Sequence, residues 1–314
     1  MPSLSSHKKA ELLEQFMEMT DRRVDRVTAQ KMLKNANYRF DAALDSYLES
    51  SSVSPSALER MFDQIRVPAR DTDKNVIDAE STMEYLNSLG VTGENAELFV
   101  VLELVRAPGF GQIARQGYVD GWKETKVPAT PAAHRQHVRE RVGQLRTDPV
   151  FFKKVYRYAF VAGKDADQKA LPLDRALVFW DMFFDANTTG RAWRSGGRRG
   201  SDGTDWLTLW KRFLGDNWTR SINRDMWNQT LEFATKSVED DTLGFWAEDA
   251  AWPGVVDDFV KWYRAGAGGA VAVVAGTMEV DEDYDVEASH DHFEAKLAAE
   301  QAWQRFARAM SRRG

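Results

Sequence analysis

Apolar residues recur at intervals of three and four along almost the whole chain, whereas strict alternation of apolar and polar residues is scarce. The first spacing places apolar side chains on one face of a helix, and the second is typical of a strand. The pattern therefore predicts an all-α fold. The chain has 314 residues, which is enough for one large or two modest domains.

A small three-helix domain is predicted over residues 6–50, where three short apolar stripes are separated by polar turns. Asp41 falls where a carboxylate would stabilise the start of the third helix. The serine-rich segment 50–55 then predicts a flexible hinge. The three stripes are Leu12, Leu13, Phe16 and Met17; Val27, Ala29, Met32 and Leu33; and Phe40, Ala43, Leu44, Tyr47 and Leu48.

A larger helical domain with an aromatic core is predicted over residues 56–264. Its Gly- and Ser-rich segment 187–205 carries several arginines and is interpreted as a disordered insertion, a solvated loop more than a site for phosphate or an acidic partner. Residues 265–314 are predicted to form a linker, a disordered acidic segment at 279–287 and a possible C-terminal helix. The arginines are Arg191, Arg194, Arg198 and Arg199.

Composition excludes several classes of function. The sequence has no cysteine, which excludes disulfides, thiolate zinc sites and a thioester carried by this chain. A net charge of −6 provides no global basic field for nucleic acid, and no apolar run is long enough to span a membrane. We therefore expect an intracellular protein that binds neither membrane nor nucleic acid.

Two groups of histidines and acids could be drawn as metal sites, but neither has the spacing of a zinc hydrolase. We interpret them as ordinary surface residues and expect neither a metal nor a cofactor. The groups are His134, His137 and Glu140, and His290, Asp291 and His292.

The segment 71–82 begins like a calcium loop, with oxygen-bearing side chains at its first, third and fifth positions. Asp71 stands at the first position. Val76 stands at the sixth position, where a calcium loop has glycine, and Asp78 stands at the eighth, where it has an apolar residue. Thr82 replaces the bidentate glutamate of the twelfth position. We expect a helix–loop–helix that keeps the EF-hand shape without the ion.

Two acidic positions begin helices near the end of the larger domain. Asn223 is a good N-cap and places Asp225 in the first turn of its helix. Pro253 starts another helix whose apolar face leaves Asp257 and Asp258 pointing outward. By spacing alone, these carboxylates are most simply solvated surface groups.

Residues 152–160, 173–180 and 225–227, together with the run Ala251-Trp-Pro-Gly-Val-Val-Asp257-Asp-Phe-Val260, resemble a known family. Residues 56–264 resemble the potentiating-neddylation domain of the defective-in-cullin-neddylation proteins. The N-terminal unit resembles the ubiquitin-associated fold that precedes this domain in the same family.

The resemblance implies a scaffold-type ligase factor that brings a conjugating enzyme, charged with a ubiquitin-like modifier, to a cullin and its RING-type ligase subunit. The chain would not be an enzyme, because the chemistry stays at the conjugating enzyme's cysteine. Two alternatives are a ubiquitin-binding adaptor, in which only residues 6–50 have a partner, and a calcium sensor that uses the Asp71 loop.

The resemblance also implies two binding sites. Asp225, Ala251 and Asp257 match an acidic patch that engages basic residues of the cullin's C-terminal winged-helix region. An apolar pocket would hold the acetylated N-terminal Met of the conjugating enzyme, although each residue of its lining could equally be core packing. That lining comprises Leu98, Val101, Phe110, Ile113, Phe179 and Met182.

Overall fold

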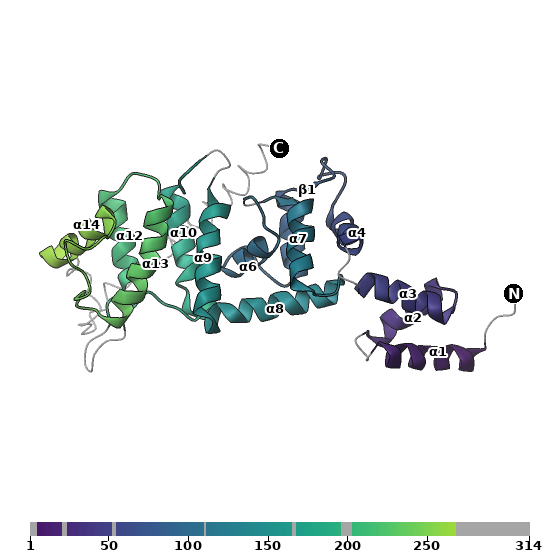
Figure 1. Ribbon diagram of the computed structural model, residues 1–314. Helices are drawn as coiled ribbons and strands as arrows, with labels where there is room; N and C mark the ends of the chain where they lie inside the picture. The colour runs from purple at the N-terminus through teal and green to yellow at the C-terminus, as the bar shows by residue number, and fades with distance from the viewer. Residues whose placement is uncertain are drawn as a thin grey trace, which may run out of the picture.

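The computed structural model is helical, as the spacing predicts, with two very short strands in its described part (Figure 1). Phe110, residues 52–54 of the predicted hinge and the chain after residue 267, with its acidic segment and predicted C-terminal helix, lie outside the described residues. No helix in the described part is both long and apolar enough to cross a membrane. The described residues are 5–20, 24–51, 55–109, 111–164, 168–195 and 203–267, excluding the side chains of 48–51 and 267.

The N-terminal unit consists of α1 (Ser6–Met19), α2 (Arg26–Asn35) and α3 (Phe40–Ser51). Ser5 caps α1 by accepting the backbone N–H of residue 8, and Asp25 caps α2 by accepting two backbone N–H groups. The three helices enclose a core separate from that of the larger domain. Its buried residues are Leu13, Phe16, Val24, Ala29, Leu33 and Ala43.

Two details of this unit differ from the prediction. Val27, assigned to an apolar stripe, has 77% of its surface exposed, because it lies in the first turn of α2 on the side away from the core. Helix α3 continues to Ser51 and therefore covers the start of the predicted hinge. Asp41 does lie in the first turn of α3, as expected.

The next part of the chain, which we call the EF-hand-like half, pairs two helix–loop–helix units. Each loop contains a two-residue strand, and the strands pair antiparallel, with Val76 opposite Ala114 and Ile77 opposite Ile113. This arrangement agrees with the predicted EF-hand shape. The elements are α4 (Pro55–Ile65), β1 (Val76–Ile77), α5 (Ala79–Ser88), α6 (Glu97–Leu104), β2 (Ile113–Ala114) and α7 (Arg115–Thr125).

Helices α6 and α7 approach each other closely at Gly121. A Cβ atom there would lie 1.8 Å from the carbonyl oxygen of Leu104, so only glycine fits. This contact brings the two helices of the second unit together beside the paired strands.

The remaining helices form the C-terminal half. Helix α8 runs beneath α6 and reaches the base of α9, while α9, α10, α12 and α13 stand side by side (Figure 1). Both halves share one continuous core. The elements are α8 (Pro131–Thr147), α9 (Pro149–Gly163), α10 (Leu173–Phe183), α11 (Ala186–Thr189), α12 (Trp206–Asn217), α13 (Arg224–Glu239), α14 (Gly254–Trp262) and a final π-helical turn (Tyr263–Ala267).

Candidate functional site

Asp225 lies in the first turn of α13 and is exposed. Asn223 caps the helix as predicted, because its Oδ1 accepts the backbone N–H of Met226 at 2.8 Å. Two residues beyond Asp225, the buried Trp227 donates its indole N–H to the Tyr156 carbonyl at 2.9 Å. The buried side of α13 is thus fixed against α9, which leaves the Asp225 carboxylate available to a partner.

Asp257 lies in the first turn of α14 but is half-buried, which corrects the prediction that it points freely outward. Its Oδ1 accepts the indole N–H of Trp246 at 2.9 Å. No described residue donates a hydrogen bond to its Oδ2. Asp258, the next residue, is exposed as predicted.

Ala251 is exposed on the segment that joins α13 to α14. Within this region, the rings of Phe233 and Phe259 lie 5.7 Å apart and join the two helices. Trp252 packs on Phe233 at 5.9 Å and anchors the connecting segment beside Ala251. The three predicted cullin-binding residues therefore lie on two packed helices and their connection. The carboxylates of Asp225 and Asp257 can accept charge-assisted hydrogen bonds from Lys or Arg. Ala251, on the connecting segment, adds only a methyl group.

The described residues of the predicted acetyl-Met pocket are all buried and come from three elements. Leu98 and Val101 lie on α6, Ile113 on β2, and Phe179 and Met182 on α10. Met182 is the most exposed of the five, at 8%. All belong to the core shared by both halves, so the pocket stays a prediction.

Phe179 shows how tightly this region is packed. Its ring lies 4.9 Å from that of Phe99 on α6, and a Cβ added to Gly163 of α9 would lie 2.3 Å from the ring. Helices α6, α9 and α10 therefore meet at Phe179, where the resemblance places part of the pocket.

A separate open groove of about 490 Å³ lies between α4 and α7. Its lining contains both bases and acids, among them Arg115, Lys123, Glu59 and Asp120. None of the predicted pocket residues lines it.

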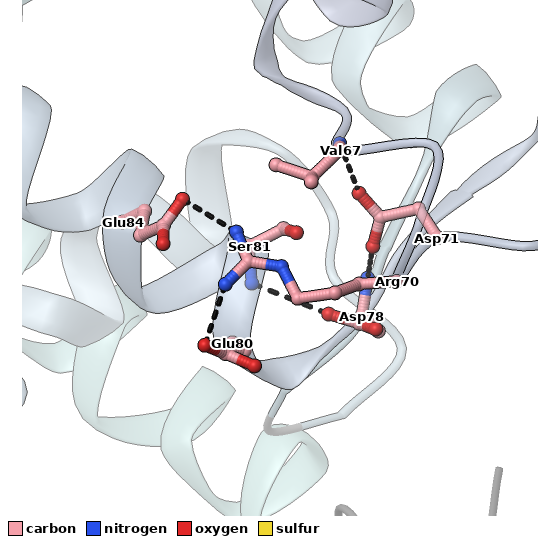
Figure 2. A network of polar contacts seen from close by, with 7 residues as sticks. All are labelled: Val67, Arg70, Asp71, Asp78, Glu80, Ser81 and Glu84. Carbon is pink, nitrogen blue, oxygen red and sulfur yellow. Dashed lines mark hydrogen bonds and ion pairs between the residues drawn. The ribbon is translucent and has the colours of Figure 1, made fainter.

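The loop that resembles a calcium site is closed by its own first carboxylate (Figure 2). Asp71 is 3% exposed, and its two oxygens accept the backbone N–H groups of Val67 at 2.7 Å and Asp78 at 2.9 Å. Burial raises the pKa of Asp71, but these backbone hydrogen bonds outweigh it, and the net pKa is lowered. Internal donors therefore occupy both oxygens of the carboxylate that would begin a calcium site.

Arg70 fastens the same loop to α5 (Figure 2). Its guanidinium contacts Glu80 at 2.6 Å and Glu84 at 2.7 Å, one turn apart on the helix. The hydrogen bond from Arg70 lowers the pKa of Glu84. The loop is thus held by charge pairs within the chain. No group of three or more metal-ligating side chains is found among the described residues.

His134 is fully buried, so its interpretation as a surface residue was wrong. Its ring stacks on that of Trp122, with the centroids 3.5 Å apart. Desolvation, and secondarily the nearby His137, lowers the pKa of His134 to about 3. No local pattern indicates this burial, because the histidine lies on α8 and the ring that it stacks on lies on α7.

The segment 187–205 is ordered where it is described, which corrects its interpretation as a disordered insertion; residues 196–202 lie outside the described part. Trp193 is 1% exposed and donates its indole N–H to Ser237 at 2.8 Å. Arg191 lies over the ring of Phe152, and Arg194 pairs with Asp205 at 2.7 Å. Two of the four arginines therefore have partners within the chain.

Two family models match the chain. A cullin-binding model matches residues 133–262, and a UBA-like model matches residues 10–54. The first match contains α13, α14 and all three predicted cullin-binding residues.

Several relatives match most of the chain. Defective in cullin neddylation protein 1 of Pyricularia oryzae is 42% identical over 275 residues, which are 85% of this chain and 95% of the relative. The protein of the same name from Mycosarcoma maydis is 28% identical over 315 residues, covering 83% and 96% of the two chains. DCN1-like protein 4 of Homo sapiens is 25% identical over 244 residues, covering 76% and 74%. The chain belongs to the defective-in-cullin-neddylation family.

Proposed function

We propose that this chain promotes cullin neddylation as a non-catalytic scaffold, which binds the cullin and the modifier-charged conjugating enzyme at the same time. The observation that carries the proposal is the placement of Asp225, Ala251 and Asp257 on α13, α14 and their connection, within the segment matched by the cullin-binding model. Family membership supports the role in neddylation.

The contribution of this chain to the reaction would be geometric. The two carboxylates would bind basic side chains of the cullin's C-terminal winged-helix region, and the exposed methyl of Ala251 would allow close approach between them. Holding both reactants on one scaffold replaces a diffusional encounter by an oriented one. Because the chain contains no cysteine, the thioester stays on the conjugating enzyme.

Further partners belong to the same proposal. An apolar pocket near α6 and α10 would take the acetylated N-terminal Met of the conjugating enzyme, because acetylation removes an ammonium charge that is costly to bury. The scaffold would act beside the RING-type subunit on the cullin, in cytoplasm and nucleus, and the N-terminal unit would bind ubiquitin.

Neither alternative function has support from the site. The backbone hydrogen bonds to Asp71 disfavour a calcium sensor. An adaptor that works only through residues 6–50 leaves the match to the cullin-binding model unexplained.

Reversing the charge of Asp257 tests the proposal. We expect Asp257→Lys to weaken binding to the cullin's winged-helix region by roughly 30-fold or more. The substitution replaces a hydrogen-bond acceptor by a positive charge, which repels the basic side chains of the cullin. The rate of cullin modification in a reconstituted assay should fall in parallel. Calorimetry measures the affinity, and a thermal melt checks the fold.

Asp258→Lys is the matched control, since Asp258 is the exposed neighbour on the same helix. It should change the affinity much less than Asp257→Lys. Equal affinities of wild type and Asp257→Lys would refute the assignment of the acidic patch.

A further inference from the structure

Trp246 is the side chain that holds Asp257, and no motif in the sequence points to it. It lies half-buried on the segment between α13 and α14, and its indole N–H donates to Asp257 Oδ1 at 2.9 Å. A free aspartate on a helix samples several rotamers. The hydrogen bond selects one of them and uses only one of the two carboxylate oxygens.

Trp246 is itself held in place by Arg264. The guanidinium of Arg264 lies 4.8 Å from the centroid of its ring. The same arginine donates to the carbonyl of Leu243 at 3.2 Å, and the backbone N–H of Trp246 donates to that carbonyl at 3.1 Å. Arg264 therefore joins the π-helical turn after α14 to the loop that carries the indole.

Residues 240–246, which we call the bracket loop, have a backbone that other contacts hold in place. Leu243 has a φ of +54° and is fully buried, a combination that costs energy and persists only where the surroundings enforce it. Asp240 provides part of that enforcement, because its carboxylate accepts the N–H of Thr242 at 3.1 Å and that of Gly244 at 2.8 Å.

The lysine nearest to Asp257 on α14 forms an ion pair with a residue other than Asp257. Lys261, one turn beyond Asp257 on α14, pairs with Glu248 at 2.7 Å, and this pairing raises the pKa of Lys261. No ion pair within 4.0 Å joins it to Asp257 in the described part of the chain. No described residue donates to the Oδ2 of Asp257 or pairs with it, which leaves this oxygen available for the proposed partner.

We propose that Trp246, held by Arg264 and the bracket loop, is a positioning residue that orients the Asp257 carboxylate for the cullin's basic side chains. The proposal rests on the proposed function of Asp257. In the free protein the carboxylate already has one orientation, so less side-chain freedom is lost when the partner binds. Asp225, by contrast, accepts no side-chain hydrogen bond from a described residue.

Trp246→Phe tests this role, because it keeps an aromatic ring over Arg264 and removes the N–H donor. We expect roughly two- to tenfold weaker binding to the cullin's winged-helix region, the scale of restraining one side chain. The melting temperature should stay unchanged. Trp262→Phe is the matched control: Trp262 lies half-buried on α14 and donates no hydrogen bond to a described residue, so its replacement should leave the affinity unaltered.

A double-mutant cycle separates positioning from a general structural effect. In an Asp257→Ala background, Trp246→Phe should cause no further loss of affinity. An equal loss in both backgrounds, or no loss in the wild-type background, overturns the role of Trp246 while leaving the scaffold function intact. If Asp257→Ala itself leaves the affinity unchanged, the acidic-patch assignment fails, and the proposal fails with it.

A second variant covers the case in which Trp246→Phe lowers the melting temperature. Benzothienylalanine, incorporated at position 246, keeps the shape of the indole and replaces the N–H by sulfur. Weaker cullin binding by this variant supports the proposal, and wild-type affinity overturns it.

Discussion

His134 is a buried base whose two ring nitrogens have no hydrogen-bond partner among the described residues. It is held by stacking on Trp122, in a contact between α7 and α8. Burial disfavours the imidazolium, and for this reason the folded protein keeps the ring neutral at physiological pH. Protonation of His134 therefore opposes folding.

We predict that acid weakens the fold through His134. The folded pKa of about 3 lies below the unfolded value, so the folded state binds the proton less readily. Stability should then fall as the pH drops below about 6.5, by at most about 1.4 kcal/mol per unit, until the folded pKa is reached. His134→Phe keeps a stacked ring and should remove this part of the pH dependence.

The measurement is the free energy of unfolding in denaturant at several pH values between about 7 and about 5. His137→Phe is the control, because His137 is only half-buried and should contribute a shallower slope. Identical slopes for wild type and His134→Phe would show that another group causes the acid sensitivity.

At the scale of elements, local signals identified where several helices begin. Asn223 caps α13 and Asp41 lies in the first turn of α3, because capping depends on residues three or four positions apart. The described residues of the segment 187–205 differ from their prediction for the opposite reason. Its Gly- and Ser-rich composition is local, whereas the burial of Trp193 depends on Ser237 in α13, far along the chain.

The loop before β1 shows how an element can keep a shape without an ion. We predict that Asp71→Asn destabilises the larger domain by roughly 1–3 kcal/mol, because the amide would turn an N–H donor toward a backbone N–H. Denaturant unfolding measures the change, and added calcium should leave it unaltered.

Asp73→Asn is the matched control. Asp73 lies in the same loop, is exposed, and accepts one backbone N–H at 2.8 Å. The Asp73→Asn substitution should lower the free energy of unfolding by less than about 1 kcal/mol. Equal stabilities of the Asp71 and Asp73 variants would contradict the role of Asp71 as the internal substitute for an ion.

At the scale of the whole molecule, one core runs through the EF-hand-like half and the C-terminal half, and the N-terminal unit has its own. The larger core gives a scaffold with a fixed distance between its parts. The predicted cullin-binding residues lie on α13, α14 and their connection, and the predicted pocket on α6, α10 and β2. Two partners bound at these places would be held in one geometry.

We predict that an acetylated peptide from the N-terminus of the conjugating enzyme inhibits cullin modification without displacing the cullin. The unacetylated peptide should be a much weaker inhibitor, since its ammonium would have to be desolvated. A reconstituted modification assay measures inhibition, and calorimetry measures cullin binding in the presence of peptide. Equal inhibition by both peptides would rule out an acetyl-specific pocket.

The sequence by itself determined the all-α class, the three-helix N-terminal unit, the loss of calcium ligands and the family. These follow from apolar spacing, capping residues and short motifs, all of which act between residues close in the chain. Only the tertiary structure decided that His134 is buried, that Trp193 is held in the core and that Asp257 is half-buried and accepts a hydrogen bond from Trp246. Each of these depends on a partner from another element, and the position of that partner is set by the packing of the helices.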